Sequence, residues 1–304
     1  MDNYVTPIKN SEDPQMQIDI GKKIYTDSGD FLLRRVKEDV LDELPAKIIY
    51  KGQQDDDVIY QSYLDRQLTS NQLSVLEDIR KEYISKLSQS AALALLAQIK
   101  KCYLHPLLTT DSTGALMNSI SSSEFWNESA RLTALHYVMH HVQSTQEKLI
   151  IFVISRAMQM KLRDRIAQDF GLLPKIISGD TKVSSNDYSQ TRLGIIDQFS
   201  KKSGFQVIIL SPIAAGVGLN ITAANHVFHL DRHWNPAKEE QANDRVYRIG
   251  QQKNVHIYYP ISKHPKAMSF DQKLDALLSR KLFLKDAIMT LPQVSERELV
   301  EAIR

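Results

Sequence analysis

The pattern of apolar and polar positions divides the chain into a helical first part and a second part in which short strands and helices alternate. Along residues 55–108, apolar side chains such as Leu64 and Leu68 recur at spacings of three and four, which predicts helices. The more apolar stretch 91–104 predicts a further helix. A segment rich in Ser, Thr and Asn over 109–128 then marks a boundary.

Beyond that boundary the pattern is that of buried strands separated by helices. The apolar runs expected to form strands are 149–154, 175–178, 206–211, 226–231 and 255–261. The helical patterns between and after them cover 156–170, 187–200, a stretch after Asn235, and 269–288. Strict alternation of strand and helix is typical of a parallel sheet covered on both faces. We therefore predict an α/β fold, with working residues on loops at the carboxyl ends of the strands.

Composition narrows the class of protein. The chain has 304 residues, 42% of them hydrophobic and 24% charged, so it can bury a sizeable core. Its 38 basic and 36 acidic residues nearly balance, which by itself does not predict nucleic-acid binding. The single cysteine, Cys102, excludes an internal disulfide, and no apolar run approaches the ~20 residues that span a bilayer. We expect a soluble protein of a reducing compartment, with no membrane partner.

The most informative segment is 211–251, whose second half carries the signals of a helix. Asn235 suits the N-cap, Pro236 the first helical position, and Gly250 the residue just past the end. The positions expected on one face of this helix are Gln241, Arg245 and Arg248, and those expected on a neighbouring face toward the sheet are Ala242, Val246 and Ile249. Two arginines one turn apart form a clamp for anionic oxygens. A solvated helix with acidic ion-pair partners is the alternative.

A glycine loop precedes this helix. Gly216, Gly218 and Asn220 follow the strand predicted over 206–211, and glycines there allow backbone N–H groups to approach a phosphate closely. A plain tight turn is the alternative for an isolated Gly-x-Gly. The position at the carboxyl end of a parallel strand favours phosphate binding.

Together these motifs resemble those of one protein family. Three motifs occur in order: a Gly-Leu-Asn loop, Asp-x-x-Trp-Asn-Pro, and Gln-Ala-x-x-Arg-x-x-Arg-Ile-Gly-Gln. On these motifs the chain resembles the second RecA-like lobe of the Swi/Snf-type ATPases of helicase superfamily two. The resemblance covers residues 31–284 and implies a RecA-like parallel sheet flanked by helices and preceded by an α-helical protrusion. The implied divisions are a tail or end of a missing first lobe (1–30), a junction helix and protrusion (31–110), a linker (111–130), the second lobe (131–268), and a C-terminal helix and tail (269–304).

The resemblance also implies roles for individual residues. Arg248 corresponds to an arginine finger on the γ-phosphate of ATP, with Arg245 beside it and Gln241 assisting. The residues implied to lie near the nucleotide are Gly216, Gly218 and Asn220, and those implied to couple the interlobe cleft to DNA are Asp231 and Trp234. The implied contacts to DNA phosphates are Ser155, Arg156, Thr181 and Ser211. One departure from the family's pattern is Ala215, where glycine is usual.

Two basic clusters add candidate DNA contacts, because phosphate binding needs only positive charge in the right place. They are Arg34 with Arg35, and Lys100 with Lys101. Solvated surface charge is the alternative for both clusters.

The chain lacks the parts that would cradle a nucleotide. An ATPase of this class needs a Gly-Lys-Ser/Thr phosphate loop and an acidic pair for Mg²⁺. Gly21-Lys22 is followed by another lysine, and Asp42-Glu43 lies in a polar helical context. We expect ATP and Mg²⁺ to be held mainly by the missing first lobe, and this chain alone to be inactive in ATP hydrolysis.

The histidines have simpler explanations than metal binding. His136 and His140 lie four apart on a predicted helix without an evident third ligand. His226, His229 and His233 straddle a strand, its end and a loop, so they do not share a ligand geometry. We predict no metal site in this chain.

The sequence therefore predicts the C-terminal half of a double-stranded-DNA-dependent ATPase and translocase, with DNA and the first lobe as partners. A non-catalytic DNA-binding module and part of a motor–nuclease fusion are the alternatives. The intact finger motif argues against the first, and the lack of a convincing nuclease arrangement argues against the second. The compact second lobe resembles bacterial members of the family, which implies a cytoplasmic protein of phage defence or DNA remodelling.

Overall fold

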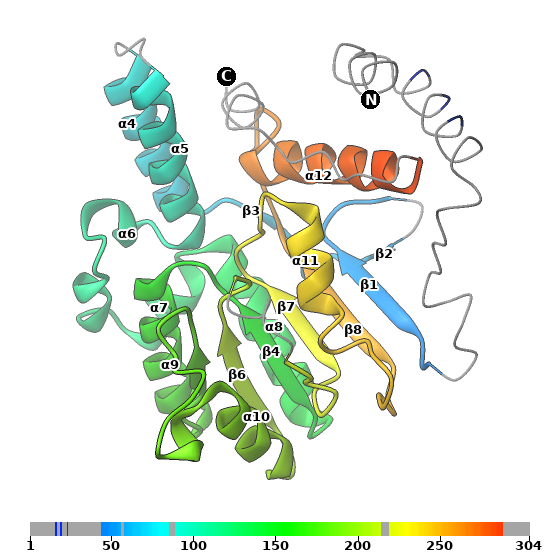
Figure 1. Ribbon diagram of the computed structural model, residues 1–304. Helices are drawn as coiled ribbons and strands as arrows, with labels where there is room; N and C mark the ends of the chain where they lie inside the picture. Colours follow the sequence, from blue (N-terminus) through cyan, green and yellow to red (C-terminus); the bar gives the residue numbers. More distant parts are fainter. Residues whose placement is uncertain are drawn as a thin grey trace.

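The computed structural model describes residues 44–55, 58–84, 89–213 and 219–287, together with Met16, Asp19 and Lys23. In this part of the chain, seven parallel strands form one sheet, the main sheet, in the order β2-β1-β8-β7-β4-β6-β5 (Figure 1). Its strands are β1 (Lys47–Lys51), β2 (Ile59–Tyr60), β4 (Lys148–Phe152), β5 (Lys175–Ile177), β6 (Gln206–Leu210), β7 (His226–His229) and β8 (Val255–Tyr259). A separate parallel pair joins β3 (Asp65–Gln67) to β9 (Ile261–Lys263). The predicted parallel α/β fold is confirmed.

Helices cover the main sheet and extend beyond it. Those of the lobe are α6 (Leu107–Thr110), α7 (Ser122–Asn127), α8 (Ala130–Ser144), α9 (Arg156–Phe170), α10 (Arg192–Lys201) and α11 (Pro236–Asn243), with short 3-10 turns η1 (Ala115–Asn118) and η2 (Tyr188–Gln190). A pair of long helices, α4 (Ser70–Ile84) and α5 (Gln89–Leu104), projects away from the sheet, and α12 (Phe270–Ala287) lies across the end of the lobe (Figure 1). None of the described helices has the length and apolar character needed to span a bilayer.

Alternate residues of each central strand pack into two separate cores. In β4, Leu149 and Ile151 face a first core that is shared with α7, α8 and α9. Ile150 and Phe152 face a second core that is shared with α10, α11 and the turns after α11. Because successive strand residues point to opposite faces, the continuous apolar run of β4 indicates a strand that is buried on both faces.

A third, smaller core attaches the projecting helices to the C-terminal helix. Tyr103 of α5 packs edge-on against Phe270 of α12, with their ring centroids 5.5 Å apart. Leu274 and Leu278 of α12 are buried in the same cluster, against which Trp234 also packs. The helical protrusion is therefore anchored on the side of the lobe that carries the loop after β7.

The prediction of helix over 55–68 is wrong. This range contains β2 and β3, and helix begins only at Ser70. Leu64 is buried in the first core, and a Cβ at Gly52 would lie 2.3 Å from the carbonyl oxygen of Leu64, so the chain folds back tightly on itself. Apolar spacings of three and four fit a folded-back strand segment as well as a helix, and pairing with β8 and β9 decides the outcome. The junction helix is expected near the start of 31–110. Residues 31–43 lie outside the described residues, and Lys47 is the first residue of β1.

The Ser- and Asn-rich stretch expected to be a linker contains helices. Ser121 is the N-cap of α7 and forms a reciprocal capping box with Glu124. Phe125 and Trp126 of this short helix are buried in the first core. The polar composition here is that of helix caps and turns, because serine side chains satisfy the free N–H groups at a helix start.

Candidate functional site

Four of the predicted DNA-contacting residues, together with Asp231, lie at the carboxyl ends of four neighbouring strands. Ser155 and Arg156 follow β4, Thr181 follows β5, Ser211 follows β6 and Asp231 follows β7. These strands are parallel, so their ends meet at one edge of the main sheet. The backbone N–H of Ser211 donates to the carbonyl oxygen of Ile177 at 2.9 Å, which joins the loop after β6 to the end of β5.

Two of the hydroxyl groups at this edge stabilise the loops themselves. Ser155 is the N-cap of α9, and its hydroxyl accepts from the backbone N–H of Met158 at 3.3 Å. The hydroxyl of Thr181 accepts from the backbone N–H of Ser178 at 3.0 Å. Both residues hold the edge in shape.

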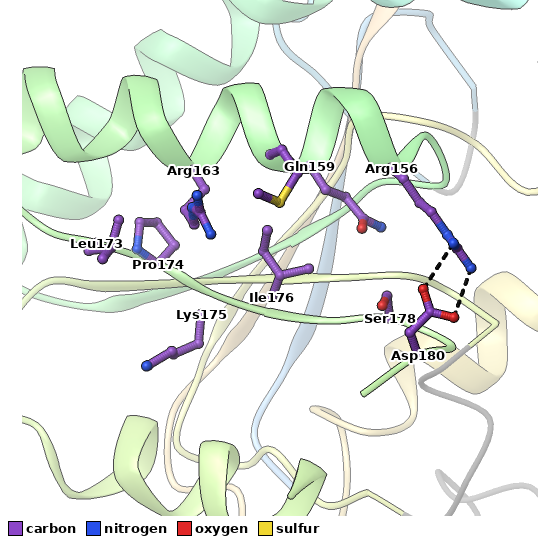
Figure 2. A pocket seen from close by; sticks show the side chains of 10 residues that line it. Arg156, Gln159, Arg163, Leu173, Pro174, Lys175, Ile176, Ser178 and Asp180 are labelled. Atoms are coloured by element: carbon purple, nitrogen blue, oxygen red, sulfur yellow. Dashed lines mark hydrogen bonds and ion pairs between the residues drawn. The ribbon is translucent and has the colours of Figure 1, made fainter. Parts of the chain in front are cut away.

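An exposed ion pair closes one end of a pocket beside this edge (Figure 2). Arg156 and Asp180 form a two-pronged contact, Nη1 to Oδ2 at 2.9 Å and Nη2 to Oδ1 at 3.0 Å. The pocket has a volume of about 380 Å³ and lies between α9 and β5, with Arg163 and Lys175 further along it. The pairing of Asp180 was not predicted, although its place in a Gly-Asp-Thr turn directly after a strand is a usable signal.

The expected single helix over 236–249 is wrong. The start is confirmed: the side chain of Asn235 accepts from the N–H of Ala237 at 3.0 Å. However, α11 ends at Asn243, and turns carry the chain to Gly250, whose φ is +97°. Only Gln241 of the three polar residues expected on one face lies on α11, so Arg245 and Arg248 are placed by turns.

Buried contacts of Asn243 explain the early end. Its side chain contacts His229 Nε2 at 2.8 Å and donates to the hydroxyl of Tyr259 at 3.0 Å, so it is anchored to β7 and β8. Val246 and Tyr247 then pack into the second core, and the backbone N–H of each donates to the carbonyl oxygen of Asn243 at 2.9 Å.

The turns over residues 244–250, which we call the arginine turns, place Arg248 on the surface of the lobe. Its side chain is exposed and forms no hydrogen bond or ion pair with any residue that the structure describes. Arg245 is half-buried. Ala242 and Val246 face the second core as expected, but Ile249 is 69% exposed, so its predicted packing on the sheet is wrong.

The glycine loop is described only at its end. Gly216 and Gly218 lie outside the described residues, while Leu219 is buried in the second core and Asn220 is exposed. The next residue, Ile221, donates its N–H to the carbonyl oxygen of Arg245 at 2.9 Å. The end of the loop is therefore attached to the arginine turns. Gln241 is exposed on the last turn of α11.

Asp231 and Trp234 lie where β7 meets the protrusion. Burial raises the pKa of the Asp231 carboxyl, while Arg131 and Lys100 oppose that rise. Arg131 donates to the carbonyl of Leu230 at 3.1 Å and also forms a buried ion pair with Asp271 of α12. Trp234 stacks on His233 and packs on the third core. This loop thus contacts the bases of both α5 and α12.

Lys100 and Lys101 differ from freely solvated lysines, because both are half-buried at the end of α5. Burial lowers the pKa of Lys100, and the nearby carboxylate of Asp231 opposes that effect. Arg34 and Arg35 lie outside the described residues.

A buried charge network that the sequence did not indicate supports the same loop. Arg232 binds Glu239 with both ends of its guanidinium, at 2.8 Å for Nε and 2.8 Å for Nη2. It also contacts Asp275 of α12 at 2.8 Å, and Lys51 contacts Asp275 at 3.0 Å. Arg232 and Glu239 are seven positions apart, but Asp275 and Lys51 come from distant segments, so no local pattern could reveal the whole network.

The histidines are distributed over separate environments. His226 contacts Glu147 at 2.6 Å and Tyr258 at 3.0 Å, whereas His229 contacts Asn243. The Nε2 atoms of His136 and His140 lie 3.2 Å apart on α8. Within the described ranges, no group of three or more His, Cys, Asp or Glu side chains could hold a metal ion.

Comparison with known proteins agrees with this arrangement. Residues 130–250 match the family described as "Helicase conserved C-terminal domain". The chain is 36% identical over 300 residues to the Zorya protein ZorD of Escherichia coli O139:H28, which covers 96% of this chain and 26% of that protein. It is 29% identical to the putative ATP-dependent helicase/translocase YwqA of Bacillus subtilis, over 98% of this chain and 30% of that protein.

A solved structure shows the same fold. The Sulfolobus solfataricus SWI2/SNF2 ATPase core in complex with double-stranded DNA superimposes with a TM-score of 0.56 at 26% identity. The match covers 93% of this chain and 54% of that chain. The chain thus spans about a quarter to a third of the length of the two bacterial relatives, at 26% and 30%. Its RecA-like sheet, the sequence motif over 241–251 and these similarities together show that the chain belongs to the Swi/Snf-type helicases of superfamily two, as a C-terminal lobe.

Proposed function

We propose that this chain is the C-terminal half of a double-stranded-DNA-dependent ATPase and translocase, and that Arg248 acts as its arginine finger. The observation that carries the proposal is the exposed Arg248 side chain, which has no partner among the described residues and stands on turns attached to the loop after β6. A guanidinium presented in this way suits an anion that is supplied from outside the lobe.

ATP fits the basic side chains of these turns. Arg248 would contact its γ-phosphate, with Arg245 beside it and Gln241 and Asn220 at the rim of the same surface. A bound nucleotide supplies the phosphoryl group, and the positive charge of the arginines would stabilise the charge that develops during transfer. The proposal assigns Mg²⁺ mainly to the first lobe, as the family resemblance implies.

Double-stranded DNA would bind along the carboxyl edge of the main sheet. Ser155, Arg156, Thr181 and Ser211 are the proposed phosphate contacts there. Asp231 and Trp234 would couple this edge to the cleft, because their loop contacts both α5 and α12. The SWI2/SNF2 core that shares the fold is described in complex with double-stranded DNA, which supports this assignment.

The proposal extends to the whole protein. The chain contains no Gly-Lys-Ser/Thr segment, so we expect no ATP hydrolysis by these 304 residues alone. We further propose that it is a bacterial, cytoplasmic protein that acts in phage defence or DNA remodelling; the 36% sequence identity to the Zorya protein ZorD of Escherichia coli supports the bacterial assignment.

The test compares DNA-stimulated ATP hydrolysis by a two-lobe form of the protein with and without Arg248→Ala. We expect a loss of about 10³-fold or more in stimulated turnover, with DNA binding retained, because a finger acts mainly in the transition state. Ile249→Ala is the matched control, since Ile249 is a neighbouring exposed side chain without charge. Equal turnover by both variants would support a non-catalytic DNA-binding module instead.

A further inference from the structure

We propose that Asp180 is an internal competitor for the guanidinium of Arg156, and that it thereby sets the affinity of the carboxyl edge for DNA phosphate. The inference rests on the proposed function, in which Arg156 contacts the backbone of double-stranded DNA. It adds a residue that regulates this contact from within the lobe.

The geometry of the pair is the first argument. Both terminal nitrogens of Arg156 are engaged by the two carboxylate oxygens of Asp180, at 2.9 and 3.0 Å (Figure 2). Arginine uses this same two-pronged geometry to bind a phosphate group. A DNA phosphate that takes both nitrogens must therefore displace the carboxylate of Asp180.

The exposure of the pair makes such an exchange feasible. The side chains of Arg156 and Asp180 are 71% and 67% exposed. Exposed ion pairs of this kind contribute only about 0.2–1 kcal/mol, so they can be broken by an incoming ligand. The Arg131–Asp271 pair contrasts with it, because both of its side chains are only 3% exposed and fixed inside the protein.

The turn that carries Asp180 is held in place. Arg192, which is 8% exposed, donates from Nε to the carbonyl of Thr181 at 3.0 Å and from Nη2 to that of Gly179 at 3.1 Å. The N–H of Thr181 also donates to the carbonyl of Ser178 at 3.2 Å, which closes the turn. The carboxylate is thus presented to Arg156 by a supported backbone, so its competition does not depend on a chance side-chain contact.

Two effects of Asp180 on DNA can be separated. Competition acts only through Arg156, whereas general repulsion of phosphate by a negative charge acts whether or not Arg156 is present. A double-mutant cycle distinguishes them, because only competition makes the effect of one substitution depend on the other.

The experiment measures binding of the 304-residue chain to a short fluorescein-labelled DNA duplex by anisotropy, at several salt concentrations. The variants are Asp180→Asn, Arg156→Gln and the double variant. Asp197→Asn is the matched control, since Asp197 pairs with Lys201 near the end of α10, at the opposite edge of the main sheet. Thermal unfolding of each variant verifies the fold.

We expect Asp180→Asn to raise affinity about three- to fivefold, as the release of an exposed ion pair predicts. Arg156→Gln should weaken binding, reduce the salt slope by about one, and abolish the gain from Asp180→Asn. Asp197→Asn should bind like the unmodified chain.

An equal gain in both backgrounds would assign Asp180 to general repulsion and overturn the inference. So would an Asp180→Asn variant that binds like the unmodified chain, or an Arg156→Gln variant that binds undiminished; in these cases the proposed DNA binding still stands. If the unmodified chain itself does not bind the duplex, the proposed DNA contact of this lobe fails, and the inference fails with it.

Discussion

The backbone N–H of Ile221 donates a hydrogen bond to the carbonyl oxygen of Arg245 at 2.9 Å. This contact joins the loop after β6 to the arginine turns. Gln251 reinforces the junction, because its buried amide nitrogen reaches the carbonyl oxygens of Thr222, Ala224 and Val246 at 3.2, 2.9 and 3.3 Å. The surface proposed to meet ATP is therefore built from two segments that are connected through the backbone.

Replacing Gln251 with Leu should loosen this junction. The amide oxygen of Gln251 also accepts from the N–H groups of Gln252 and Lys253, both at 2.9 Å. Removing the amide leaves buried carbonyl groups unpaired, which costs about 1–3 kcal/mol of unfolding free energy. Urea denaturation measures the loss. Gln252→Leu, at an exposed neighbouring position, should change stability by less than about 0.5 kcal/mol. Equal losses in the two variants would contradict the bracing role.

Replacing Asp271 with Asn should destabilise the attachment of α12 strongly. Its carboxylate pairs with the buried Arg131 and accepts from the backbone N–H of Ser262 at 2.9 Å. The substitution leaves a buried cation without its partner, so we expect a loss of about 3–5 kcal/mol in denaturant unfolding. Asp164→Asn, in the more exposed pair with Arg163, should cost less than about 1 kcal/mol. A small loss of unfolding free energy for Asp271→Asn would contradict this prediction and show that another anionic group pairs with Arg131.

The stability of the lobe should fall on acidification through His226. The carboxylate of Glu147 can only accept, so His226 donates from Nε2, and its Nδ1 accepts from the hydroxyl of Tyr258. Burial lowers the pKa of His226 to about 4, which keeps the ring neutral in the folded state. The histidine of the unfolded chain, with a pKa of about 6.5, therefore binds a proton at a higher pH than His226 of the folded chain does. Acidification thus favours the unfolded state.

This contribution is complete above about pH 6.5 and declines toward pH 4, by about 3 kcal/mol in total. Burial raises the pKa of Glu147, but hydrogen bonds from Lys253 and His226 outweigh it and lower the value to about 2, so Glu147 stays charged over this range. Urea unfolding at a series of pH values should show a shallower slope for His226→Gln. The exposed His140, replaced in the same way, should leave the slope unchanged. Identical slopes for His226→Gln and the unmodified chain would refute the assignment.

Replacing Gly194 with Ala should destabilise α10 even though alanine favours helices. A Cβ at Gly194 would lie 1.9 Å from the carbonyl oxygen of Tyr188, which belongs to the backbone of η2 and cannot rotate away. Such crowding costs about 1–3 kcal/mol. Gly179→Ala is the control, because a Cβ there meets no atom within 4 Å. Thermal unfolding should separate the two variants, and similar midpoints would mean that η2 shifts without cost.

The sequence predicted well where a pattern repeats over many residues. The helix expected over 156–170 is α9 with the same bounds, and the run 206–211 contains β6. A strand that is buried on both faces needs a continuous apolar run, and a helix with one buried face needs apolar residues every three or four positions. Both requirements concern residues close together along the chain, so the sequence alone reveals both.

The candidate site was predicted in part. The sequence placed Ser155, Thr181 and Asp231 at strand ends, and parallel pairing brings those ends to one edge. It did not indicate the pairing of Arg156 with Asp180, since those residues are 24 positions apart and meet only because β4, β6 and β5 are neighbours.

The sequence by itself determined the alternating α/β order, the family motifs and the residue types available for binding anions. Only the tertiary structure decided where α11 ends, because Asn243 is held by His229 and Tyr259 of two other strands. It also decided that β1 and β3 form, since they pair with β8 and β9, about two hundred positions away. Local periodicity constrains neighbours along one element, whereas helix ends, strand pairing and ion pairs depend on groups that the folded chain brings together from distant segments.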